Sequence, residues 1–150
     1  MKRFQSILIC FLMLFSLAVP ANAAETKTTL FHSETLMENG ILVIDELVAY
    51  PQTRSSTQSY ERSKTFKSGD TTIAIIAISG TFRYDGNTVS VVSKTVSRTD
   101  TYDGWNYSQN SFTSSGGTIT LKGKLTKTLV PSISFTMTLS CDKDGNISYT

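Results

Sequence analysis

The sequence has few of the residues that enzymes commonly use for catalysis. Its 150 residues include one histidine, His32, and two cysteines, Cys10 and Cys141. A zinc site needs three or four histidine, cysteine or carboxylate ligands, and a serine or cysteine triad needs a histidine beside its nucleophile. The sequence also lacks a Gly-x-Ser-x-Gly elbow and a phosphate-binding glycine loop. We therefore predict a protein that is not an enzyme and that uses no metal and no cofactor.

Charged residues are scarce as well. They make up 17% of the chain, against roughly 25% in an average soluble domain, and serine and threonine take their place. This composition excludes a long charged disordered tail, a disulfide-dense scaffold, a coiled coil and a polytopic membrane protein. A chain of this length forms one domain rather than two.

Two acidic clusters remain as candidate sites. Asp142-x-Asp144-Gly-Asn places oxygen ligands at alternate positions, as calcium prefers, but an EF-hand loop continues to a bidentate glutamate, and no acidic residue follows this segment. Asp100 and Asp103 lie together at one turn, whereas a glycosidase pair flanks its substrate. Both clusters are typical of turns, which favour aspartate, asparagine and glycine.

The first 23 residues have the pattern of a secretory signal peptide. Lys2 and Arg3 precede the apolar stretch Ile7–Val19, and an Ala-Asn-Ala motif ends at Ala23. We predict cleavage after Ala23 and a secreted, extracellular protein. The apolar stretch of about 13 residues spans about 20 Å as a helix, which is short of the roughly 30 Å hydrocarbon core. We therefore expect no stable membrane insertion after cleavage.

Removal of this segment leaves a formally neutral chain with twelve basic and twelve acidic residues. A neutral chain gives no support for nucleic-acid binding. The acids gather in Glu25–Tyr50 and the bases in Pro51–Val130, so the acidic segment either folds against the basic body or is solvated. Cys10 is lost with the signal, and Cys141 has no intrachain partner. We expect a buried thiol there, the alternative being an intermolecular disulfide.

Hydrophobic residues recur with period two in the C-terminal part of the chain. In Ile133–Cys141 every second residue is apolar, and serine or threonine lies between, which predicts a half-buried strand with Cys141 facing the core. Thr118–Thr128 repeats the pattern, with Gly123 at an inward position. A glycine at such a position indicates a bulge or a closely packed neighbour.

Three further segments also predict strands. Thr71–Tyr84 carries isoleucines at both odd and even positions, which favours a strand covered on both faces. In Thr88–Thr101 the valines switch from odd to even positions between Val91 and Val92, which indicates a bulge there. Arg54–Lys67 is mostly polar and is typical of an edge strand.

Turn sequences separate these segments, so the expected fold class is all-β. Asp-Gly-Asn, Asp-Gly and Ser-Gly-Gly motifs leave short spacers that favour antiparallel neighbours. We predict an up-and-down meander of about six strands over residues 54–150, folded as a β-sandwich or a rolled sheet. Residues 24–53 form an acidic N-terminal segment with a turn at Glu38-Asn39-Gly40. This segment is interpreted as a hairpin, with a single strand or a short helix over Asp45–Ala49 as alternatives.

One aromatic cluster is a candidate ligand-binding site. Tyr102, Trp105 and Tyr107 lie close together in the sequence, beside aspartate and asparagine. Aromatic rings with neighbouring amides and carboxylates are typical of sugar- or peptide-binding surfaces. A single tryptophan in a small β-domain is also typical of a core residue, and exposure of the three rings together would distinguish these interpretations.

Three stretches carry a resemblance to other proteins. Ser79–Gly86 reads Ser-Gly-Thr-Phe-Arg-Tyr-Asp-Gly, Tyr102–Trp105 reads Tyr-Asp-Gly-Trp, and Leu139–Asp142 reads Leu-Ser-Cys-Asp. Over about two-thirds of its length the chain resembles uncharacterised small secreted proteins of Gram-positive, clostridia-type bacteria. The resemblance implies secretion and a β-fold, and it transfers no activity, ligand or functional residue.

These observations favour a secreted, non-enzymatic β-domain that binds a cell-surface glycan or protein. Alternatives are a structural or assembly protein that pairs through β-edges or through Ile73–Ile78, and a bacteriocin-like secreted protein. An enzyme would need acids that only the fold brings together. The sequence leaves the ligand and the oligomeric state open.

Overall fold

The computed structural model describes residues 26–52, 56–102 and 104–150. These ranges contain no helix, and therefore none that could cross a membrane. The predicted signal peptide and its cleavage site, with Cys10, lie outside the described residues, as does Asp103. The nine strands are β1 (Thr28–Leu36), β2 (Ile41–Ala49), β3 (Thr57–Ser68), β4 (Thr71–Tyr84), β5 (Val89–Arg98), β6 (Asn106–Ser115), β7 (Thr118–Lys127), β8 (Val130–Cys141) and β9 (Ile147–Tyr149).

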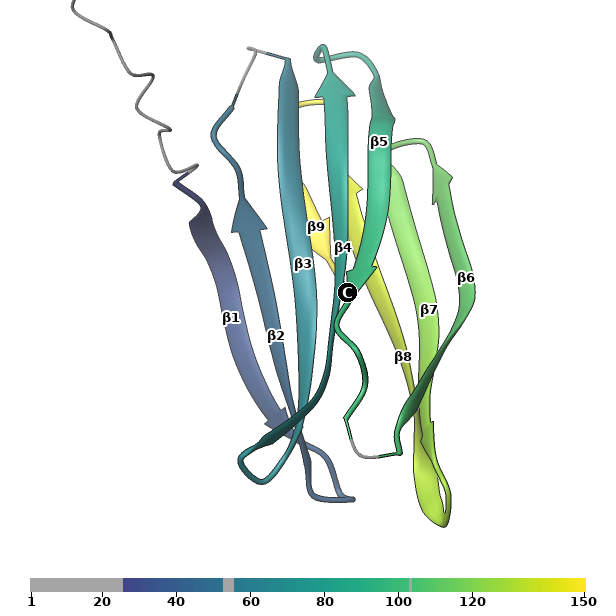
Figure 1. Cartoon of the computed structure of the whole chain (residues 1–150). Coiled ribbons are helices and arrows are strands. Elements are labelled where there is room, and N and C mark those ends of the chain that lie inside the picture. Colours follow the sequence, from purple (N-terminus) through teal and green to yellow (C-terminus); the bar gives the residue numbers. More distant parts are fainter. Residues whose placement is uncertain (1–25, 53–55, 103) are drawn as a thin grey trace, which may run out of the picture.

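The strands form two antiparallel sheets in which each strand pairs with its neighbour in sequence. One sheet has the order β1-β2-β3-β4-β5, and the other has the order β6-β7-β8-β9. After β5 the chain crosses from the five-stranded sheet to the four-stranded sheet, as Figure 1 shows. The prediction of an antiparallel meander that folds as a β-sandwich is confirmed. Residues 57–150 contain seven strands rather than about six, because the three-residue β9 follows β8.

The core lies between the inner faces of the sheets. Alternate residues of β7 and β8 point inward, as the period-two pattern predicts, and Cys141 is 5% exposed. Burial of one such leucine or isoleucine side chain contributes about 1.5–3 kcal/mol. The largest fully buried side chains are Phe66, Phe82, Leu47, Ile73, Ile76, Ile78, Ile119, Leu121, Leu125, Ile133, Met137 and Leu139.

Two predicted local features are also present. The register between β4 and β5 shifts from Thr81–Ser93 to Phe82–Val91, so Val92 is the extra residue of a bulge. Gly123 is closely packed, because a Cβ there would lie 2.6 Å from Cζ of Phe135.

The expectation that β4 is covered on both faces is only partly met. Ile73 is 1% exposed, yet Ile75 is 36% exposed on the outer face of the sheet. A second bulge explains why Ile73 and Ile75, two residues apart, lie on opposite faces of the sheet. The register between β3 and β4 shifts between Phe66 and Lys67 and leaves Ile73 as the extra residue. Main-chain pairing between chains through Ile76–Ile78 would require β3 or β5 to be displaced, because both already pair with these residues, whereas the β4–β5 ladder does not include Ile73–Ile75.

The prediction that β3 is an edge strand is wrong. β3 lies between β2 and β4, and its charged residues Arg62 and Lys64 point into the sandwich, where both contact Asp45 of β2. The acidic N-terminal segment thus folds against the basic body at this point. It forms the hairpin β1–β2, as the sequence predicts. Residues Asp45–Ala49, for which a short helix was the alternative, belong to strand β2.

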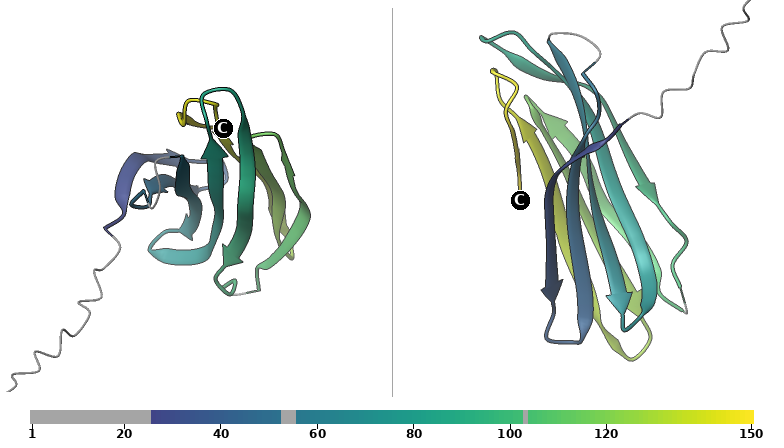
Figure 2. Two further views of the ribbon diagram at one scale, coloured as in Figure 1. Left: turned by 90° about the horizontal axis from the view of Figure 1, so that it is seen from above. Right: turned by 90° about the vertical axis from the view of Figure 1, so that its left-hand side faces the viewer.

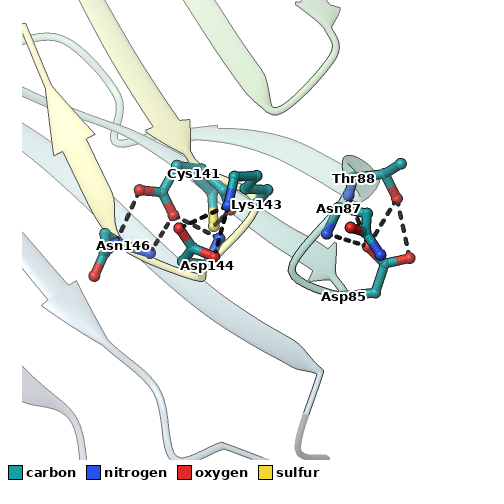
Figure 3. A network of polar contacts seen from close by, with 8 residues as sticks. Asp85, Asn87, Thr88, Cys141, Lys143, Asp144 and Asn146 are labelled. Atoms are coloured by element: carbon teal, nitrogen blue, oxygen red, sulfur yellow. Dashed lines mark hydrogen bonds and ion pairs between the residues drawn. The ribbon is translucent and has the colours of Figure 1, made fainter.

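The Asp142–Asn146 segment is a hairpin turn, as its sequence predicts. Oδ1 of Asp142 accepts hydrogen bonds from the main-chain N–H groups of Asp144 and Asn146, at 2.9 Å each. Hydrogen bonds from the Asn146 side chain and main chain lower the pKa of the Asp142 carboxyl below its ordinary value. Figure 3 shows this turn beside the β4–β5 turn, and the Gly86 N–H joins the two turns by donating to the Lys143 carbonyl at 2.8 Å.

Candidate functional site

A pocket lined by hydroxyl groups lies on the outer face of the five-stranded sheet. Its volume is about 300 Å³. Strand register explains its composition, because the outward-facing residues of β3, β4 and β5 are mostly serine or threonine and lie opposite one another. We call it the hydroxyl pocket, and the side chains that line it include those of Tyr50, Pro51, Ser59, Ser79, Thr81, Ser93 and Thr95.

One end of the hydroxyl pocket is organised by a carboxylate. Oε2 of Glu61 accepts hydrogen bonds from the Tyr50 hydroxyl at 3.0 Å and the Ser79 hydroxyl at 3.1 Å. Oε1 of Glu61 forms an ion pair with Lys27 at 3.3 Å. The Lys27 ammonium also lies 4.7 Å from the centroid of the Tyr50 ring. These contacts fix the Tyr50 side chain and offset the charge of Glu61, so this end of the pocket is close to neutral.

The remaining hydroxyl groups of the pocket are available to a ligand. The Ser59 and Thr81 hydroxyls bond to each other at 2.9 Å. Ser93 and Thr95 are exposed on β5, and their hydroxyls have no partner among the residues that the structure describes. A hydroxyl is both a donor and an acceptor. The pocket therefore suits a neutral molecule that carries several hydroxyl groups of its own.

The three aromatic residues predicted as a ligand platform are not exposed together. Trp105 is 7% exposed and belongs to the core, whereas Tyr102 is 58% exposed. Tyr107 is half-buried on the inner face of β6 and stacks on Phe135, with ring centroids 6.3 Å apart. The core interpretation of Trp105 therefore holds.

The Tyr107 hydroxyl is an unusual group in this core. It is buried and has no hydrogen-bond partner within the described part of the chain. Burial raises the pKa of this hydroxyl, while the nearby Arg98 acts in the opposite direction. The ring sits beneath the Arg98 guanidinium, 5.6 Å from its centroid.

The histidine and the cysteine lie in unlike surroundings and on different sheets. His32 of β1 is half exposed and lies near Glu34 and Glu46. Cys141 of β8 is buried in the core. Across the described ranges, no three histidine, cysteine, aspartate or glutamate side chains are grouped as metal ligands.

The Cys141 thiol is expected to be unreactive in the folded protein. Burial, with a smaller contribution from Asp142, raises its pKa from 9.0 to about 11. At pH 8 this shift lowers the thiolate fraction roughly a hundredfold. A chain that begins at Ala24 has this one cysteine. Its iodoacetamide labelling rate should therefore rise at least a hundredfold in urea, and equal rates in folded and unfolded protein would contradict a buried thiol.

The residues of the hydroxyl pocket are not those that the sequence pointed to. Each strand shows polar alternation, but only the register of β3, β4 and β5 shows that these hydroxyls meet. The fold class that emerges is a two-sheet antiparallel β-sandwich. Comparison with protein-family models, curated proteins and solved structures gives no match.

Proposed function

We propose that this protein is an exported, non-enzymatic β-sandwich domain that binds a neutral carbohydrate of a cell-surface glycan in the hydroxyl pocket. The observation that carries the proposal is the group of aligned serine and threonine hydroxyls beside the Tyr50 ring. The signal-peptide pattern at the N-terminus supports export.

The chemistry of the pocket favours a sugar over a charged or apolar ligand. Sugar hydroxyls both donate and accept hydrogen bonds, as do the hydroxyls of Ser93 and Thr95. Tyr50 and Pro51 supply apolar surface for the C–H groups of a sugar ring. Glu61 is held by Lys27, Tyr50 and Ser79, so it can orient the pocket without placing a net charge in it.

A glycan array probed with the chain from Ala24 to Thr150 tests this proposal. We expect binding to neutral oligosaccharides that weakens about fivefold in Tyr50→Ala and in Thr95→Val, since each removes a contact worth roughly 1 kcal/mol. Tyr102→Ala is the matched control, because Tyr102 is an exposed tyrosine outside the pocket. Thermal unfolding of each variant verifies its fold.

Absence of binding to every glycan on the array would overturn the proposal. So would binding that Tyr50→Ala and Thr95→Val leave unchanged, because the pocket would then take no part in it. A Trp105→Ala variant is unsuitable for this test, since Trp105 lies in the core and its loss would change the fold stability.

A further inference from the structure

The outer face of the four-stranded sheet carries positive charge and no negative charge. From Gly104 to Cys141 the sequence contains three lysines but no aspartate or glutamate. Lys122 and Lys124 lie two residues apart on β7, the strand between β6 and β8. The left-hand view of Figure 2, from above, shows the two sheets as separate layers, so one face of the four-stranded sheet lies outward. Both lysines lie on this outer face, because Leu121, Gly123 and Leu125 take the inward positions between and beside them.

Strand register places each of these lysines between two hydroxyl groups. One hydroxyl residue comes from β6 and one from β8, and residues directly opposite each other share a face of the sheet. We call the two rows the lysine rows, and they consist of Ser111, Lys122 and Thr136, and of Ser108, Lys124 and Ser134. None of the six side chains has a hydrogen bond or ion pair within the described part of the chain. The rows cover an area about 7 Å long and about 10 Å wide.

The lysine rows offer hydrogen-bond donors to an anion. An ammonium group has three donors and no acceptor, and a serine or threonine hydroxyl can also donate. The two lysines are closer together than the screening length of about 8 Å at physiological ionic strength, so their charges act together. This is the reverse of the hydroxyl pocket, where Lys27 offsets the charge of Glu61.

The surroundings of the lysine rows favour a sugar polymer over other polyanions. The outward-facing residues next to the rows are Thr113, Thr120 and Thr138 on one side, and Asn106 and Thr126 on the other. Nucleic-acid bases stack on aromatic rings, and no aromatic ring lies among these residues. They also include no apolar side chain that could anchor a partner protein or enter a bilayer. Hydroxyl and amide groups, in contrast, match the hydroxyl groups of a sugar.

We propose that the lysine rows bind an acidic polysaccharide, in which the sugar units carry anionic groups among several hydroxyls. The polymer lies along β7, and its anionic groups contact Lys122 and Lys124. Its hydroxyl groups exchange hydrogen bonds with the serines and threonines on either side. This site is independent of the hydroxyl pocket, which lies on the outer face of the other sheet.

Polygalacturonate, a polymer of a sugar that carries a carboxylate, tests the proposal against the chain from Ala24 to Thr150. Its methyl ester is the matched probe, because it has the same backbone without the charge. We expect saturable binding of polygalacturonate, with NMR shifts at the amides of Lys122 and Lys124. Binding of the methyl ester should be at least about tenfold weaker. Binding of polygalacturonate should also weaken about tenfold in 1 M salt, where the screening length falls to about 3 Å.

Protein variants locate the binding on the lysine rows. Lys122→Gln should weaken binding of polygalacturonate about fivefold, and the double variant Lys122→Gln, Lys124→Gln should abolish it. Lys143→Gln is the matched control, because it removes the same charge from an exposed lysine in the β8–β9 turn, outside the rows. Tyr50→Ala should bind polygalacturonate as the wild-type protein does, which separates this site from the hydroxyl pocket.

Three results would overturn the proposal. The first is absence of saturable binding of polygalacturonate, or equal binding of its methyl ester. The second is binding that the double variant retains, because the lysine rows would then take no part in it. The third is tighter binding to single-stranded oligothymidylate or to vesicles of anionic phospholipid, since the occupant would then be a nucleic acid or a membrane.

Discussion

Replacement of Asp45 by asparagine is expected to lower the free energy of unfolding by about 3–5 kcal/mol. Asp45 and Arg62 are 8% and 3% exposed, and the carboxylate is the charge that both Arg62 and Lys64 contact. Asparagine keeps the shape and removes the charge. Arg62 would then keep only its hydrogen bonds to the Thr138 and Thr150 main-chain oxygens, and Lys64 would lose the carboxylate that it contacts, which is the costly case for a buried ion pair.

Urea unfolding of Asp45→Asn, followed by the fluorescence of Trp105, measures this effect. Trp105 is the single tryptophan and is buried, so its emission reports loss of the core. Glu46→Gln is the matched control, because Glu46 lies next to Asp45 on the opposite face and its side chain is 43% exposed. We expect a change within about 0.5 kcal/mol for the control. Equal stabilities of the two variants would show that the cluster is not buried.

The same carboxylate makes the stability depend on pH. Burial alone would raise the pKa of Asp45, but hydrogen bonds and charges from Arg62 and Lys64 together hold it below the ordinary 3.8. A lowered acid pKa contributes stability above its unfolded value, and this stability is lost as the pH falls through the folded value. Asp45→Asn should therefore lose less stability than the wild-type protein between pH 5 and pH 2.

Replacement of Phe82 by alanine is expected to cost about 3–5 kcal/mol. Phe82 is fully buried on the inner face of β4. Its ring centroid lies 6.1 Å from that of Tyr60, and a Cβ on Gly80 would lie 3.1 Å from its Cε2 atom. Loss of the ring would leave a cavity between two rigid sheets, and neighbouring side chains can fill it only in part.

Phe112→Ala is the control for this substitution, since it removes the same atoms. Phe112 is half-buried on β6, and the Lys94 ammonium lies 4.7 Å from its ring centroid. A loss of about 1 kcal/mol is expected there. Urea unfolding compares the two variants directly, and equal losses would place Phe82 outside the core.

The sequence predicts those features of the fold that depend on neighbours along the chain. Alternation in Ile133–Cys141 sets which side chains face inward, and the phase change at Val91-Val92 locates a bulge. The edge assignment of β3 failed because it depends on a partner elsewhere. Arg62 and Lys64 look like solvated charges until the register shows Asp45 opposite Lys64 on β2.

The candidate site could not be predicted for a related reason. The proximity of Tyr102, Trp105 and Tyr107 in the sequence suggested a surface cluster. Trp105 is instead buried in the core. The hydroxyl pocket draws Ser59, Thr81 and Ser93 from three strands and becomes visible only when those strands are aligned.

The assignment of each sheet to one continuous half of the chain has a consequence for folding. All five strands of the first sheet come from residues 28–98 and all four of the second from residues 106–149. Every strand pairing closes a short loop, and closing a short loop costs little conformational entropy. The docking of the halves then brings together distant residues such as Arg62 and Thr138. We expect this docking step to set the folding rate, and each sheet to be vulnerable to aggregation until it is complete.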